Sequence, residues 1–255
     1  NAEMDDLQRA SATTAAKLER EFALRQTILR STGTELFTTK SEYRDKRKKL
    51  DSDYAGCRAF IRTNIKYTDA PNGVCRPFYA QIAVAQAGGT GIQKAVDDGY
   101  DTAAQELSTL EQTTINDRLK AVVEFFPETS QLLVVDNSRG IVSRADSGKA
   151  ISDQAVKRVD ELATQALEKS IEAEFVQDGD LRKIVFAYPI DQGAVIAIYD
   201  LDNAKFLYPS WKSAPIDNTK AYVVVADQKS GSSYPKLDDT GLYKPVLDEK
   251  QSGGQ

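Results

Sequence analysis

The chain has 255 residues, of which 41% are hydrophobic and 28% charged, a composition that indicates one or two globular domains and excludes a fibrous or wholly disordered protein. Its net charge of -5 and pI near 5.1 argue against a nucleic-acid partner, because phosphate-binding proteins need clustered cations. The densest basic run, residues 44–49, is flanked or interrupted by four acidic residues and is typical of a solvated helix face, with a phosphate or lipid-headgroup patch as the alternative.

The first third of the sequence predicts two helices. Residues 2–37 lack proline and carry an apolar stripe with spacings of three, four and seven residues, which Arg25 and Thr32 interrupt. The stripe consists of Ala15, Leu18, Phe22, Leu29 and Leu36. We expect a homodimer to form along this helix. A second helix is predicted over residues 41–65, with Cys57 on its apolar face.

The two cysteines, Cys57 and Cys75, lie on either side of the turn-rich residues 69–73. A chain that turns back here permits a disulfide, which would close a loop of roughly 17 residues and stabilise the fold by about 3 kcal/mol. Such a bond indicates an oxidising compartment. The alternative is two reduced, buried thiols.

The middle of the chain predicts a short buried helix over residues 78–87, a break at the glycine-rich residues 88–91, and a long helix over residues 102–126 that stops at Pro127. Whether residues 40–100 form a second sensor lobe or a helical cap is left open by the sequence.

Beyond Pro127 the pattern changes to strands. A hairpin is predicted from residues 131–135 and 141–144, then a helix over residues 153–170. Three more strands are predicted at residues 172–176, 181–187 and 194–199, the last two joined through residues 189–193. The connections are mostly too short for parallel crossovers, so we predict an antiparallel sheet and an α+β fold. Residues 221–226 read as a further strand and 205–211 as a weaker one, within a loop-rich tail.

The order of long helix, hairpin, helix and three-stranded meander over about residues 102–200, with the turn Val135-Asp-Asn-Ser-Arg-Gly140, resembles the Cache family of PAS-like extracytoplasmic sensors. The resemblance implies a five-stranded antiparallel sheet that binds a small molecule, often an amino acid or carboxylate. It also implies attachment to a membrane-bound histidine kinase, chemoreceptor or cyclase. The aromatic-Arg-aromatic signature of the amino-acid-binding members is absent from the sequence.

Four candidate ligand-binding residues follow from this topology: Arg144, Arg182, Tyr188 and Asp200. An arginine can bind a ligand carboxylate through two hydrogen bonds, and an aspartate can bind an amine. Alternatively, these residues are ordinary charges at strand ends.

Catalysis is not expected. The chain has no histidine, which excludes Ser-His-Asp and Cys-His nucleophile pairs and removes the commonest metal ligand. Residues 88–91 and 147–149 do not match a phosphate-binding loop, and residues 177–180 do not match a calcium loop. We therefore predict that the protein is not an enzyme and that it binds neither a cofactor nor a metal ion.

The expected organisation is a helical region over residues 1–100, a sensor domain over residues 101–227 and a tail over residues 228–255. The expected function is periplasmic or extracellular small-molecule sensing, and the alternative is a helical protein-interaction module. No stretch of about 18 apolar residues is present. Asn1-Ala2 resembles the remnant of a cleaved expression tag, so we expect membrane attachment only through segments outside the printed sequence.

Overall fold

The structure is a computed structural model that describes residues 2–63, 73–89, 91–146, 153–178 and 181–201, together with 225–226 and 233–234. The chain divides into two compact units: unit 1 is Asn1–Thr34 with Leu119–Gln255, and unit 2 is Glu35–Arg118. This division differs from the three consecutive regions expected from the sequence, because helix α1, Ala2–Thr63, contributes residues to both units.

Helix α1 is one uninterrupted helix, where the sequence analysis expected two. The expected break at residues 38–40 contains two threonines and a lysine but neither glycine nor proline. Threonine disfavours a helix by less than about 1 kcal/mol per residue, which is too little to end one that packing stabilises on both sides.

Unit 1 is built on a five-stranded antiparallel sheet, as predicted, and the fold class is α+β. Its strands follow one another in the order β2-β1-β5-β4-β3. Their bounds are β1 Thr129–Asp136, β2 Ile141–Asp146, β3 Ile171–Asp178, β4 Leu181–Ile190 and β5 Gly193–Asp200. Strand β4 extends through Pro189, which the sequence analysis placed in a turn. Proline has no backbone N–H, but β3 pairs with β4 only as far as Ala187, so no hydrogen bond to β3 is lost at Pro189.

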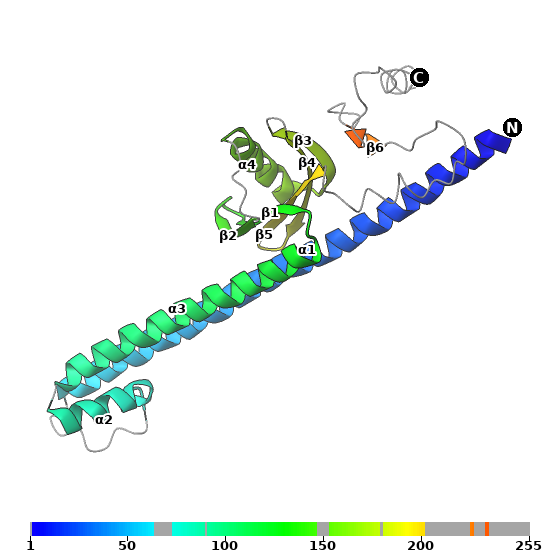
Figure 1. Ribbon diagram of the computed structural model, residues 1–255. Coiled ribbons are helices and arrows are strands. Elements are labelled where there is room, and N and C mark those ends of the chain that lie inside the picture. Colours follow the sequence, from blue (N-terminus) through cyan, green and yellow to red (C-terminus); the bar gives the residue numbers. More distant parts are fainter. Residues whose placement is uncertain are drawn as a thin grey trace. The chain divides into compact units, whose positions relative to one another are not determined.

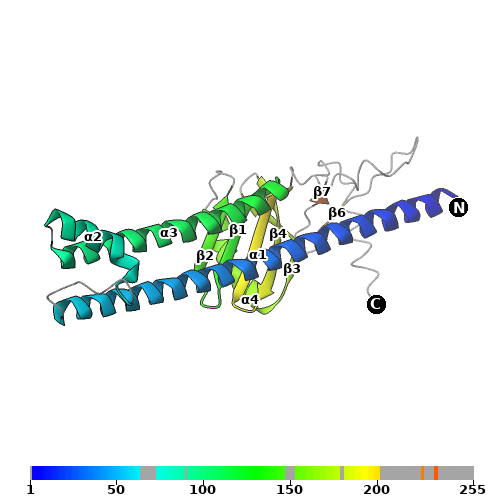
Figure 2. The same ribbon diagram turned by 90° about the horizontal axis from the view of Figure 1, so that it is seen from below.

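Helices cover both faces of this sheet (Figures 1 and 2). Helix α4, Asp153–Glu168, packs on one face, where Leu162, Ala163 and Ala166 join an apolar cluster with Val185, Ile196 and other alternate strand residues. We call this the α4 face.

The other face, here the α1 face, carries the first half of α1. Phe22 contacts Phe186, with ring centroids 5.1 Å apart, and a Cβ added at Gly33 would meet the side chains of Ile190 and Val195. Gly33 therefore lets the helix lie close to β5. Phe22 packs on the sheet of the same chain, and Leu29 is fully buried. The middle of the apolar stripe on α1, from which a homodimer was expected, is therefore already covered within one chain. The homodimer itself stays a prediction.

The hairpin turns of the sheet are fixed by specific residues. The Asp136 carboxylate accepts hydrogen bonds from the backbone N–H and hydroxyl of Ser138 and from the backbone N–H of Gly140. These bonds, the Ser138 hydroxyl first, lower the pKa of Asp136. At Gly193, a Cβ would collide with the carbonyl oxygen of Val135, so only glycine fits opposite β1.

Unit 2 contains the second half of α1, the short 3-10 helix η1 (Arg76–Phe78), α2 (Tyr79–Gly88) and most of α3 (Ile92–Phe125). Helix α2 ends at Gly89, which adopts a left-handed conformation. Helix α3 starts ten residues earlier than expected, because Gly99 does not interrupt it. The core of the unit is formed by Cys57, Cys75, Phe78, Ile82 and Val96.

The described residues after 201 form one two-stranded pairing, β6 (Val225–Ala226) with β7 (Ser233–Tyr234). The strand expected at residues 221–226 is seen only at its last two residues. The strand expected at 205–211 and most of the tail at 228–255 lie outside the described residues. Within the part of the chain that is described, no helix has the length and hydrophobicity needed to span a bilayer.

Candidate functional site

Unit 1 contains a buried polar and aromatic cluster between α1 and the sheet, which we call the α1-sheet cluster. Its members are Phe22, Arg25, Phe126, Glu128, Phe186, Tyr188 and Tyr199. Phe186 and Tyr199 pack edge to face at 5.6 Å, and Tyr199 packs in the same way on Phe126 at 6.2 Å. Two of these rings, Phe126 and Tyr199, lie against one charged residue contributed by α1.

That residue is Arg25, whose side chain is only 2% exposed. Its guanidinium forms an ion pair with Glu128, which lies just before β1, and hydrogen-bonds the Glu21 carboxylate at 2.7 Å. The guanidinium carbon also lies 4.6 Å from the centre of the Phe126 ring. A buried charge with two carboxylates and an aromatic face is well compensated, so Arg25 fixes the position of α1 on the sheet.

Two tyrosine hydroxyls lie on the same face. Burial raises the pKa of both Tyr188 and Tyr199, and it is the largest cause of the shift in each. The Glu172 carboxylate raises the pKa of Tyr188 further, whereas the positive charge of Arg25 lowers the pKa of both tyrosines. The Tyr188 hydroxyl has no hydrogen-bond partner among the described residues, although the residue is fully buried. Leaving a buried hydroxyl unpaired costs about 1–3 kcal/mol, so the Tyr188 hydroxyl lowers the stability of the folded state.

A second charged pair lies on the α4 face. Lys183 at the start of β4 is 6% exposed, and its ammonium group forms an ion pair with Asp200 at the end of β5. The two residues face each other in the strand register, and Lys183 is two residues before Val185 of the α4-face core.

The two charged pairs are linked through the backbone. The N–H of Asp200 donates a hydrogen bond of 3.2 Å to the carbonyl oxygen of Glu128, whose carboxylate pairs with Arg25. Lys183, Asp200, Glu128 and Arg25 therefore form a continuous series of contacts, which we call the polar chain. It runs from the α4 face, past the ends of the neighbouring strands β1 and β5, to α1.

The three named candidates whose side chains are described are not brought together. Tyr188 lies on the α1 face, whereas Asp200 lies on the α4 face, because it pairs with Lys183 there. Arg144 of β2 also belongs to the α4 face, since it pairs with Leu133 of that core, and it is exposed. In the sheet, Arg144 is level with Ile196 of β5. Ile196 and Asp200 are four residues apart, so Arg144 and Asp200 are separated by roughly 13 Å along the strand direction.

Arg182 occupies the β4 position opposite Gln177. Its side chain lies outside the described residues. Asp200 is partly buried and forms an ion pair with the buried Lys183.

Sequence reasoning missed Arg25, Glu128 and Lys183. Arg25 did leave a signal, as the charge that interrupts an apolar stripe. Lys183 left none, because a lysine near the start of a strand is usually solvated. Glu128 follows Pro127 in what reads as a loop.

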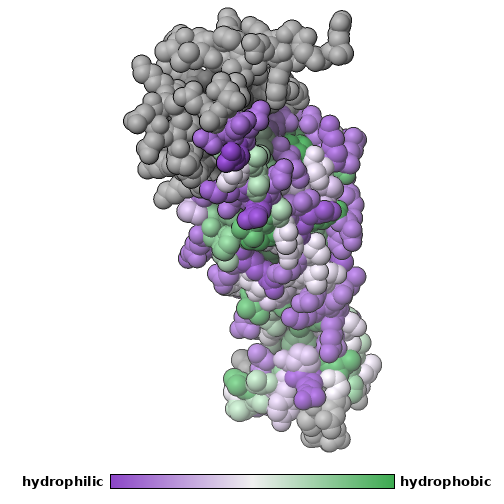
Figure 3. Space-filling model, turned by 90° about the vertical axis from the view of Figure 1, so that its right-hand side faces the viewer, coloured by the Kyte–Doolittle hydropathy of each residue, from purple (hydrophilic) through white to green (hydrophobic). Residues whose placement is uncertain are grey.

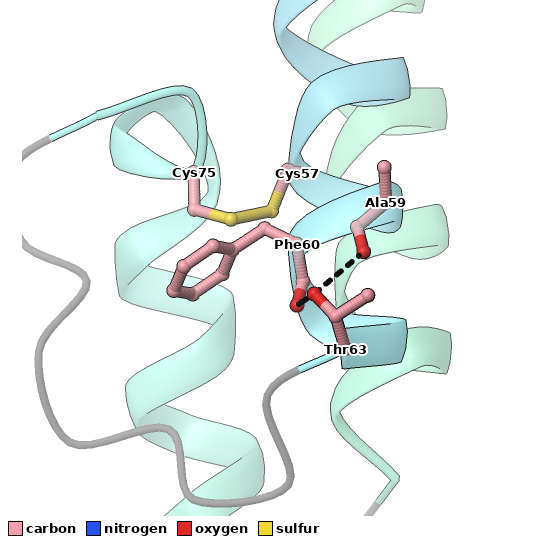
Figure 4. The surroundings of a disulfide bond; sticks show 5 residues. All are labelled: Cys57, Ala59, Phe60, Thr63 and Cys75. Carbon is pink, nitrogen blue, oxygen red and sulfur yellow. Dashed lines mark hydrogen bonds between the residues drawn. A yellow bond between two sulfur atoms is a disulfide. The ribbon is translucent and has the colours of Figure 1, made fainter.

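Unit 2 holds the disulfide that the sequence analysis favoured. Cys57 of α1 is bonded to Cys75, which precedes η1, and both residues are buried (Figure 4). In the last turn of α1, the Thr63 hydroxyl donates to the carbonyls of Ala59 and Phe60, at 3.3 and 3.0 Å. The bond thus joins the far end of α1 to the start of the η1–α2 segment.

Within the described part of the chain, no group of three or more acidic, histidine or cysteine side chains is arranged to hold a metal ion. Comparisons of the chain with protein-family models, curated proteins and solved structures found no match.

Proposed function

We propose that this chain is the extracytoplasmic ligand-sensing domain of a bacterial membrane-bound receptor of the histidine kinase, chemoreceptor or cyclase type. Unit 1 binds a small molecule on its sheet, and α1 carries the response along the molecule. The arrangement of long helix and five-stranded antiparallel sheet supports this proposal, since it is what the Cache resemblance implies. The disulfide supports an oxidising location.

The observation that carries the proposal is the polar chain. A ligand that takes Asp200 or Lys183 as its partner must disturb their ion pair, and Asp200 is hydrogen-bonded to the same residue that holds Arg25 of α1. Ligand binding on the α4 face is thereby coupled to the position of α1. Coupling of this kind requires only that the ligand bind one helix position more tightly than another.

The charges of the pair also suggest the ligand class. Lys183 is complementary to a carboxylate and Asp200 to an amine, and the two lie side by side in a largely apolar setting. A zwitterion such as an amino acid satisfies both partners at once, and exchange of one ion pair for two limits the cost of desolvation.

A thermal-shift screen of the chain against amino acids, organic acids, nucleosides and polyamines tests the proposal. A ligand at a hundred times its Kd stabilises a protein by about 2.7 kcal/mol, which corresponds to about 5–10 °C in Tm for a chain of this size. We expect a shift with one of the first two classes.

Asp200→Asn and Lys183→Gln, which each remove one partner of the ion pair, are expected to reduce this shift. The matched control is Asp191→Ala, which removes an exposed aspartate from the turn at the other end of the β4–β5 hairpin and should leave the shift unchanged. A panel without any shift, or a shift that Asp200→Asn leaves intact, would contradict the proposed site.

A second function, as a helical protein-interaction module, is favoured by a different observation. Helix α2 of unit 2 exposes Tyr79 and Val84, which are 51% and 72% accessible. In this case the helices bind a partner and the sheet serves as a rigid base. The absence of membrane-spanning segments from the full-length gene product would favour this function over the sensor.

A further inference from the structure

Helix α2 is apolar on both of its faces. Its inner face contributes Ile82 and Ala85 to the buried residues of unit 2, next to Phe78 of η1. A helix on a protein surface normally presents charged residues outward, and one that is apolar all round is normally covered on all sides. Helix α2 departs from both patterns, because its outer face is exposed.

The outer face consists of Tyr79, Ala80, Ala83, Val84 and Ala87, which we call the α2 patch. Of the two large side chains in the patch, Tyr79 and Val84, Val84 is the more exposed, at 72%. The patch lies within residues 77–93, the longest stretch of the sequence without a charged residue. Apolar residues reach the surface at the α2 end of unit 2 in Figure 3.

The patch is held in place from beneath. Cys75, bonded to Cys57, lies one residue before η1, and η1 leads directly into α2. Gly56 of α1 also approaches Val74 closely, so that a Cβ there would lie 3.1 Å from its side chain. A surface that is already ordered loses little conformational entropy when it binds.

We propose that the α2 patch is a homodimer contact, in which two copies of the chain pair α2 against α2 around a twofold axis. A twofold axis places residues near their own copies, so any charge close to the axis would repel itself. The α2 patch has none, although each chain carries a net charge of -5 that opposes association elsewhere. Three alanines also permit close approach of the two helix backbones.

The contact is small, because a ten-residue helix is about 15 Å long. Interfaces of this size fall at the low end of the range for specific complexes, so the dimer should dissociate on dilution. All residues of the α2 patch lie in unit 2, so this contact does not depend on the proposed sensing function of unit 1.

Sedimentation velocity of the whole chain over a range of concentrations tests the proposal. We expect a concentration-dependent dimer that is lost in Val84→Glu and in Val84→Lys, and that returns when these two variants are mixed. Two controls replace exposed leucines outside the patch: Leu110→Glu on α3, and Leu24→Glu on the first half of α1. Both should dimerise as the wild type does. Circular dichroism checks that each variant is folded.

Three results would overturn the proposal. A wild type that stays monomeric at all concentrations would show that the patch is not a homodimer contact. A dimer that Leu24→Glu abolishes and the Val84 variants retain would place the contact on α1. Loss of the dimer in both Val84 variants without recovery in their mixture would show that Val84 does not face its own copy. None of these outcomes bears on ligand binding by unit 1.

Discussion

The buried ion pair between α1 and the sheet should be a major source of stability for unit 1. We predict that Glu128→Gln lowers the free energy of unfolding by about 3 kcal/mol. The Arg25 and Glu128 side chains are 2% and 6% exposed, and breaking a buried pair costs about 3–5 kcal/mol when one charge is left behind. The lower end applies because Glu21, which is 41% exposed, still pairs with Arg25.

The double variant Arg25→Met with Glu128→Gln removes both buried charges and should recover most of the loss, because the remaining Glu21 carboxylate is partly exposed to water. Urea denaturation followed by circular dichroism gives the free energies. The control is Asp98→Asn, which removes the partner of Lys94 on an exposed face of α3 and should have no measurable effect. A Glu128→Gln variant as stable as the wild type would refute the view that this pair fixes α1 on the sheet.

Three further predictions concern stability. Tyr188→Phe should raise the free energy of unfolding by about 1 kcal/mol, because it removes a buried hydroxyl that has no partner among the described residues; a loss of that size would mean that the hydroxyl is satisfied. Burial raises the pKa of Tyr188 and Tyr199 in the folded state above the unfolded value of about 10. Their contribution to stability is therefore complete below about pH 10, and above that pH the free energy of unfolding falls by up to about 1.4 kcal/mol per pH unit for each tyrosine. Tyr199→Phe should reduce this slope in denaturation curves at alkaline pH, and an unchanged slope would contradict the assignment. Replacing Cys57 and Cys75 by serine should cost about 3 kcal/mol, and reductant should lower the Tm of the wild type but not of this variant.

The sheet was predictable because strand patterns are local. Short apolar, β-branched runs and the turns between them identify all five strands without knowledge of their partners. Helix boundaries were harder: residues 38–40 weaken a helix and Gly99 weakens it more, yet tertiary packing carries α1 and α3 through both positions.

The site was less predictable because it depends on register. The sequence analysis placed the last hairpin turn at residues 189–193, whereas the strands continue to Ile190 and resume at Gly193. In the observed register Asp200 pairs with Lys183, and Tyr188 lies on the opposite face. The contact between Arg25 and Glu128 joins residues 103 positions apart, which no local pattern specifies.

In the proposed sensor, a ligand bound by the sheet acts on α1. Amide hydrogen exchange, measured with and without the compound that raises the Tm most in the screen, tests this coupling. We expect slower exchange both in β4 and β5 and in residues 22–33 of α1. Slower exchange in the strands with no change in α1 would contradict it.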